Sequence, residues 1–157
     1  MTMFGSPWFG VDTTTNPISL DATASVGSLG GSNVERINDD AALPQFTTAS
    51  TPTSGAVICK LDFGAAQLIA GFVATNIKQN AGVGDGVSFR VEYSSDDSSY
   101  STFGTAFSVS PGNVNTTETQ TPTEQTMRYW QFTANQNFDA VALIGELALY
   151  ASVGQMP

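Results

Sequence analysis

Two neighbouring carboxylates, Asp96 and Asp97, are the residues whose spacing first suggests chemistry. A pair of carboxyl groups can hydrolyse a glycosidic bond when its environment raises the pKa of one member enough for that group to act as an acid. This pair lies in an Asp-Asp-Ser-Ser turn between two strand-like segments, where acidic side chains are expected to stay solvated and ionised. The pair therefore does not predict a glycosidase.

Other catalytic residues are scarce in the 157-residue sequence, which contains no histidine and a single cysteine, Cys59. This composition removes histidine acid–base catalysis, the Ser-His-Asp arrangement and the His/Cys ligand sets that hold zinc. Cys59 ends an apolar run over residues 56–59, which is more typical of a small buried hydrophobe than of a nucleophile. We therefore expect a protein without enzymatic activity.

The segment Arg-Tyr-Trp-Gln-Phe at residues 128–132 is typical of a β-strand whose side chains alternate between two faces. Because successive side chains of a strand point to opposite faces, Trp130 and Phe132 share one face while Tyr129 and Gln131 share the other. We expect Trp130 to pack in a core rather than to serve as a platform for a sugar ring. Its neighbours on the other face are then available to solvent or ligand.

Arg128 opens the same segment and needs a carboxylate partner if it lies beside buried strand residues. The sequence offers Asp62, Glu92 and Glu146 as candidates. A structural ion pair is the first interpretation, and an arginine that grips a ligand is the alternative.

Short strands are the elements expected to position these residues. Val87, Phe89, Val91 and Tyr93 alternate with polar residues before the Asp-Asp-Ser-Ser turn, which predicts a β-hairpin. Turn signals such as residues 63–65 separate further segments, whereas residues 18–52 and 115–126 read as irregular or as polar loop. The pattern predicts an all-β antiparallel sandwich with strands over residues 56–63, 68–76, 87–94, 100–109, 127–133 and 141–150.

The first twenty residues differ in composition from the rest of the chain, because large aromatic residues occur there beside glycine and proline. Phe4, Trp8 and Phe9 lie on a backbone interrupted by glycine and proline, so neither a helix nor a long strand is expected there. Such an apolar arm either folds back over its own sandwich or contacts another chain as an assembly anchor. We therefore divide the chain into an arm over residues 1–20 and a sandwich over residues 21–157.

The net charge and the positions of the basic residues limit which binding partners are expected. The net charge is −9, and the five basic residues are spread along the chain, so no cluster could neutralise several phosphates. Neither nucleic acid nor an anionic membrane surface is an expected partner. There is no apolar run of eighteen residues and no secretory-signal pattern at the N-terminus, so we expect neither a membrane span nor export through a cleaved signal.

Four motifs occur in a recognisable order: Leu-Asp-Phe-Gly at 61–64, the hairpin at 89–100, residues 128–132, and Gly-Glu-Leu-Ala-Leu-Tyr-Ala at 145–151. Over residues 33–151 the chain resembles the discoidin, or coagulation-factor type C, domain and related galactose-binding-like modules. That resemblance implies a jelly-roll antiparallel β-sandwich. The chain departs from the family pattern in the early loop at residues 38–41 and at Phe46, which stands where a tryptophan is common.

The resemblance also implies sites. Its ligand-binding positions correspond to Phe46, Arg128 and Tyr129, and its structural Ca²⁺ would be held by Asp39 of the early loop and Glu146 of the closing strand. Calcium takes six to eight oxygen ligands, which such residues can offer, although Asn and Asp also populate turns for conformational reasons alone. No other cofactor is expected.

Two functions remain. The first is a non-enzymatic virion structural protein, such as a phage tail or capsid-decoration component. It would be made in the host cytoplasm, would bind other virion proteins or copies of itself, and could also adhere to host-surface glycans. Its assembly contacts would be Phe4, Trp8 and Phe9. The alternative is an extracellular carbohydrate-binding module that recognises glycans through loops at one end of the sandwich.

Overall fold

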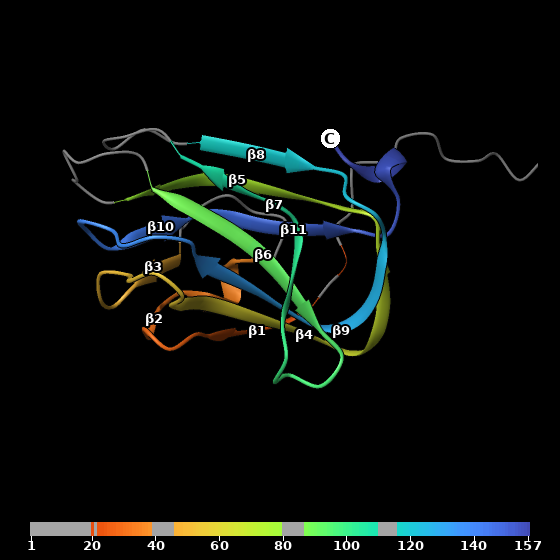
Figure 1. Ribbon diagram of the computed structural model, residues 1–157, viewed down its shortest axis with the longest axis horizontal. Coiled ribbons are helices and arrows are strands. Elements are labelled where there is room, and N and C mark those ends of the chain that lie inside the picture. Colours follow the sequence, from red (N-terminus) through yellow and green to blue (C-terminus); the bar gives the residue numbers. More distant parts are fainter. Residues whose placement is uncertain (1–19, 21, 39–45, 80–86, 110–115) are drawn as a thin grey trace, which may run out of the picture.

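Two antiparallel sheets form the molecule (Figure 1). The computed structural model describes residues 20, 22–38, 46–79, 87–109 and 116–157, so the assembly contacts predicted for Phe4, Trp8 and Phe9, as well as Asp39, lie outside the described residues. The first sheet has five strands in the order β1-β4-β9-β6-β7. Their bounds are β1 Thr23–Val26, β4 Val57–Ile69, β9 Gln125–Ala134, β6 Ser88–Ser94 and β7 Ser101–Ser108.

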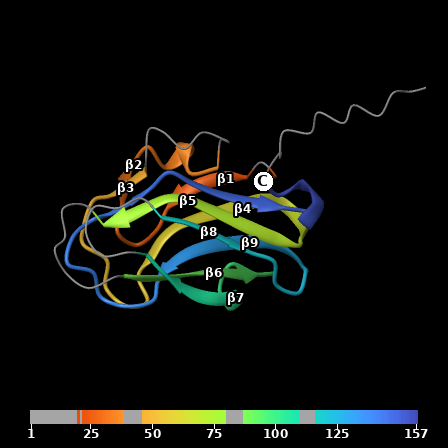
Figure 2. The same cartoon turned by 90° about the horizontal axis from the view of Figure 1, so that it is seen from above.

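The second sheet packs across the core from the first. It has the order β11-β5-β10-β3-β2, with β8 paired to β5 outside that path. The bounds are β11 Glu146–Tyr150, β5 Gly71–Gln79, β10 Ala142–Ile144, β3 Phe46–Thr48, β2 Gly31–Ser32 and β8 Thr116–Gln120. Two single-turn 3-10 helices, η1 Val34–Arg36 and η2 Val153–Gln155, complete the described elements. Figure 2 shows the two layers from above.

The core is built from the alternation that the sequence predicts. Phe89 and Val91 of β6, and Trp130 and Phe132 of β9, are all fully buried. The rings of Phe89 and Phe132 stack with centroids 4.8 Å apart and planes 3° apart. Burial of each such side chain contributes roughly 1.5–3 kcal/mol, so these strands are fixed face-inward. The predicted core role of Trp130 is confirmed.

Cys59 also belongs to this core. It is fully buried, and burial raises the pKa of its thiol to about 12 even though a backbone hydrogen bond with Phe132 lowers it. The thiol is therefore neutral at pH 7 and behaves as the small apolar side chain that the sequence predicts.

Three sequence predictions about secondary structure were wrong. Strands β1, β2 and β3 lie within residues 18–52, and β8 lies within the predicted loop 115–126. β4 runs through the predicted turn at 63–65, with a register shift between Asp62 and Gln67 against β9 and a positive φ of 73° at Gly64. A glycine inside a strand can mark a bulge that bends the strand without ending it, and here it does so.

One glutamine side chain joins the two sheets along one side. The Gln120 amide of β8 accepts from the Thr105 N–H of β7 at 2.9 Å and donates to the Thr105 carbonyl at 3.0 Å. The preceding Gly104 has φ of 79°, and a Cβ there would lie 2.3 Å from Gln120 Oε1. The glycine thus permits the amide to approach and to satisfy the exposed backbone of edge strand β7.

The sandwich has two ends. At one end, called here the hairpin end, lie the β6–β7 turn and the start of β9, while the connection from β3 to β4 lies at the other (Figure 1). Within the described ranges, no helix is both long and apolar enough to cross a membrane.

Candidate ligand-binding surface

The outer face of the five-stranded sheet carries polar side chains in register. Because Cys59 and Leu61 of β4 point into the core, the alternating Lys60 and Asp62 point outward. Strand pairing places them in two transverse rows, Lys60-Gln131-Glu92 and Asp62-Tyr129-Ser94, across β4, β9 and β6.

Arg128, the residue before Tyr129, forms a two-pronged ion pair with Asp62 of the second row. Arg128 Nε and Nη2 donate to the two carboxylate oxygens of Asp62 at 2.7 and 2.9 Å. The guanidinium lies over the Tyr129 ring, 4.7 Å from its centroid. The Arg128 hydrogen bond, with one from the Gly64 N–H, holds the pKa of Asp62 below its usual value. The predicted ion pair of Arg128 is thus confirmed, with Asp62 as the partner among the three candidates.

Lys60 makes a second ion pair beside the first. Its Nζ lies 2.6 Å from Asp97 Oδ1 and 5.4 Å from the centroid of the Tyr100 ring. The Tyr100 hydroxyl also donates to Asp97. The hydrogen bonds from Lys60 and then Tyr100 lower the pKa of Asp97, although burial and the like charge of Asp62 partly oppose them. Because Lys60 and Asp62 are two residues apart on the same face of β4, the two ion pairs are neighbours.

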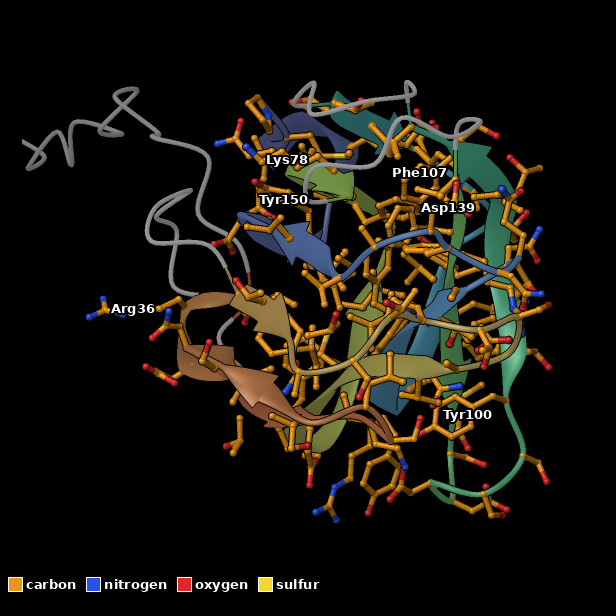
Figure 3. The ribbon with its side chains drawn as sticks, turned by 90° about the vertical axis from the view of Figure 1, so that its left-hand side faces the viewer. Arg36, Lys78, Tyr100, Phe107, Asp139 and Tyr150 are labelled. Atoms are coloured by element: carbon orange, nitrogen blue, oxygen red, sulfur yellow. The ribbon has the colours of Figure 1, made fainter. Side chains whose placement is uncertain are left out.

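The hairpin turn positions Asp97 and Tyr100. Asp96 Oδ1 accepts from the Ser98 and Ser99 N–H groups and from the Ser94 hydroxyl, all at 2.8–3.0 Å. These bonds, the Ser99 and Ser98 backbone bonds most of all, hold the pKa of Asp96 well below its usual range. Asp97 follows with φ of 57°, a left-handed conformation that Asp tolerates better than most residues. The Asp-Asp-Ser-Ser sequence therefore aims Tyr100 back toward β4 (Figure 3).

These groups form one surface, which we call the tyrosine surface: Lys60, Asp62, Asp97, Tyr100, Arg128 and Tyr129. Its four charged side chains are 34–43% exposed. Both carboxylates have lowered pKa values and are ionised at neutral pH, so neither can serve as a general acid. The surface offers two aromatic rings, cationic donors and anionic acceptors, which suits noncovalent binding of a hydroxyl-rich ligand.

The remaining predicted site residues fall elsewhere. Phe46 has no exposed surface, because its ring packs in the core against Gly31, so the assignment of Phe46 to a ligand contact is corrected. Glu146 is 5% exposed in β11, and its predicted calcium partner Asp39 lies outside the described residues. In the ranges that the structure describes, no group of three or more His, Cys, Asp or Glu side chains is placed to hold a metal. The calcium site stays a prediction.

Sequence reasoning named Arg128 and Tyr129 as ligand-binding residues; both belong to the tyrosine surface, and their role in binding stays a prediction. It missed Lys60 and Tyr100 as members of this surface and took Asp97 only as a solvated tip residue. The signal available was the outward alternation of Lys60 and Asp62 in β4 and the position of Tyr100 at the end of the turn. Neither signal shows by itself that the two segments meet.

The opposite end has a different chemistry in its described part. The Ser54 N–H donates to Asn137 Oδ1 at 2.9 Å, and Arg90 Nη1 donates to Asn135 Oδ1 at 2.9 Å. No aromatic side chain is exposed among residues 49–56 and 135–141, because Phe138 is buried. The described part of this end therefore lacks the ring surfaces found at the hairpin end.

We compared the chain with protein-family models, curated proteins and solved structures. No protein-family model matches the chain, and no curated protein matches it. Among solved structures, the CBM32 carbohydrate-binding module of AlyQ in complex with 4,5-unsaturated mannuronic acid is 22% identical with a TM-score of 0.59, and the match covers 85% of this chain and 96% of that one.

Two other solved structures have a similar fold over most of their length. CBM32-1 from a family 31 glycoside hydrolase of Clostridium perfringens is 14% identical with a TM-score of 0.62, over 87% of this chain and 98% of that one. Chitosan-binding module 1 from a chitosanase/glucanase of Paenibacillus sp. IK-5 is 16% identical with a TM-score of 0.60, over 85% and 96%. These matches lend no support to a virion role, which stays a prediction. They show that the fold is the discoidin-like, galactose-binding-like antiparallel β-sandwich that the sequence predicts.

Proposed function

We propose that the protein is a carbohydrate-binding module without catalytic activity and that the tyrosine surface is its glycan contact. The observation that carries the proposal is the meeting of Tyr100 and Tyr129 with two exposed ion pairs on one sheet face. The fold shared with several carbohydrate-binding modules supports the same reading.

The chemistry of a sugar fits these groups. The C–H face of a pyranose ring is apolar and packs on an aromatic ring, while its hydroxyls donate to carboxylates and accept from ammonium or guanidinium groups. On this surface the rings of Tyr100 and Tyr129 each lie beside a cation that orients them. The ion pairs hold the polar groups in place before the ligand arrives, which reduces the entropic cost of binding.

The first test is binding of the full chain to a glycan array and to soluble polysaccharides by affinity gel electrophoresis. Tyr129→Ala and Tyr100→Ala are expected to weaken binding at least tenfold, about 1.4 kcal/mol, because each removes a ring. Tyr129→Phe keeps the ring and should retain most of the affinity.

The matched control lies at the other end of the sandwich. Asn137→Ala removes the acceptor of the Ser54 N–H and should leave glycan affinity unchanged. A loss of binding in Asn137→Ala with full binding in both tyrosine variants would move the site to that end. A chain that binds no carbohydrate at all would reject the proposed function.

A further inference from the structure

The cations of the tyrosine surface are already neutralised by its own carboxylates. Lys60 is paired with Asp97 at 2.6 Å, and Arg128 donates two hydrogen bonds to the two carboxylate oxygens of Asp62. Arg90, the next cation on the same sheet face, is paired with Glu92 at 2.7 Å. An anionic ligand would therefore meet cations whose charge is already balanced by a neighbouring carboxylate.

The local charge makes the binding of an anion here unfavourable. Lys60 and Arg128 contribute two positive charges, whereas Asp62, Asp96 and Asp97 contribute three negative ones, so the surface with its turn carries a net charge of −1. Asp62 and Asp97 lie beside the two cations and would repel any carboxylate that bound to them.

Charge farther away adds to this effect. The whole chain carries −9, and the remaining basic residues, Arg36 and Lys78, lie on other parts of the molecule from Tyr100 (Figure 3). The long-range field that an anionic polymer meets as it approaches is therefore repulsive, and it is strongest at low ionic strength.

We infer that the tyrosine surface binds uncharged sugar residues and discriminates against uronic acids. This inference rests on the proposed function and specifies its ligand class. Neutral hydroxyls can donate to Asp62 and Asp97 and accept from Lys60 and Arg128 without breaking either ion pair. A uronate carboxylate also has only acceptors, but it brings a negative charge to two cations whose charge Asp62 and Asp97 already balance.

A matched pair of ligands tests the inference. A neutral glycan that binds in the array is oxidised at its primary alcohols to the corresponding uronate, and a portion of that product is converted to the methyl ester. Titration calorimetry in 50 mM NaCl should show the uronate at least tenfold weaker than the neutral glycan. The methyl ester, which has the oxidised carbon but no charge, should regain most of the affinity, and the deficit of the uronate should shrink in 500 mM NaCl.

Asp62→Asn provides the complementary gain of function, because it leaves Arg128 without an anionic partner. Its affinity for the uronate should rise at least fivefold relative to the wild type, and Asp97→Asn should do the same through Lys60. Thermal melting of both variants confirms that they are folded.

Three outcomes are distinguishable. Preference for the neutral glycan, with a gain in the asparagine variants, supports the inference. Equal or tighter wild-type binding of the uronate overturns it while leaving the proposed function standing. Absence of binding to every neutral and acidic glycan rejects the proposed function and the inference with it.

Discussion

Two charged clusters share the outer face of the five-stranded sheet and differ in almost every respect that decides their use. In the Glu92 network, made of Arg90, Glu92, Gln131 and Thr133, the carboxylate side chain is 9% exposed. In the tyrosine surface, Asp62 and Asp97 are 38% and 43% exposed. Clusters of like composition on the same face can therefore serve folding or binding, according to burial.

Hydrogen bonds complete the contrast. Glu92 Oε1 accepts from Arg90, and Oε2 accepts from Gln131 and Thr133, each at 2.7 Å. Burial raises the pKa of Glu92, but these donors outweigh burial and lower it overall. A buried, fully bonded charge stabilises the fold only while all its partners remain, whereas exposed pairs contribute little to stability and keep donors and acceptors that a ligand can reach.

The largest expected effect on stability comes from Glu92→Ala. This change leaves three donors without their acceptor in a buried place, so the free energy of unfolding should fall by about 2–4 kcal/mol in urea titrations. Glycan affinity below the unfolding transition should not change. Glu124→Ala, which removes an exposed glutamate, is the matched control and should stay within about 0.5 kcal/mol of the wild type. Equal free energies of unfolding for the two variants would show that the Glu92 network does not stabilise the fold.

The sequence predicted the part of this arrangement that depends on local alternation. The faces of β6 and β9, the burial of Trp130 and the hairpin turn all follow from a period of two and from turn chemistry. Asp62 was only one of three carboxylates named as candidate partners of Arg128, and the pairing of β4 with β9 is what singles it out. The strand faces and the hairpin turn, by contrast, need only a few neighbouring residues to specify them.

The missed parts depend on contacts distant in the chain or on weak strand signals. The Lys60–Asp97 pair joins residues 37 apart, and only the order β4-β9-β6 brings them together. Phe46 lies in a three-residue strand, which is too short to show which face is buried. β8 is a polar edge strand of threonine, glutamate and glutamine, so it has no apolar stripe to distinguish it from a loop.

A smaller effect is expected where the Lys60–Asp97 pair is removed. A double-mutant cycle with Lys60→Met and Asp97→Asn should give a coupling energy below about 1 kcal/mol, because exposed ion pairs gain little against solvent. The same substitutions should alter the relative affinity for neutral and uronate glycans. A coupling above about 2 kcal/mol would place this pair with the Glu92 network as a folding element.

The smallest expected effect is the loss of stability at acidic pH that Asp62 and Asp97 cause. The pKa values of Asp62 and Asp97 are lowered in the folded state, so their stabilisation is fully present above the unfolded pKa of about 3.9 and is lost as the pH falls through the lower folded value. The free energy of unfolding should therefore stay level from pH 7 to about pH 5 as far as these groups are concerned, and should decline below about pH 4. The decline from this pair of residues should be under about 1 kcal/mol because both side chains are screened by solvent.

Glu92 loses stabilisation in an overlapping range, since its folded pKa is also lowered from a usual value near 4.3. The two clusters can be separated by comparing the wild type with an Asp62→Asn, Asp97→Asn double variant in urea titrations between pH 2.5 and pH 6. If the exposed pairs contribute as little as their solvent exposure implies, the variant should retain most of the acid sensitivity, which then belongs to Glu92 and the other carboxylates. A variant whose stability no longer changed with pH would instead assign acid sensitivity to the tyrosine surface and would reverse the roles given to the two clusters.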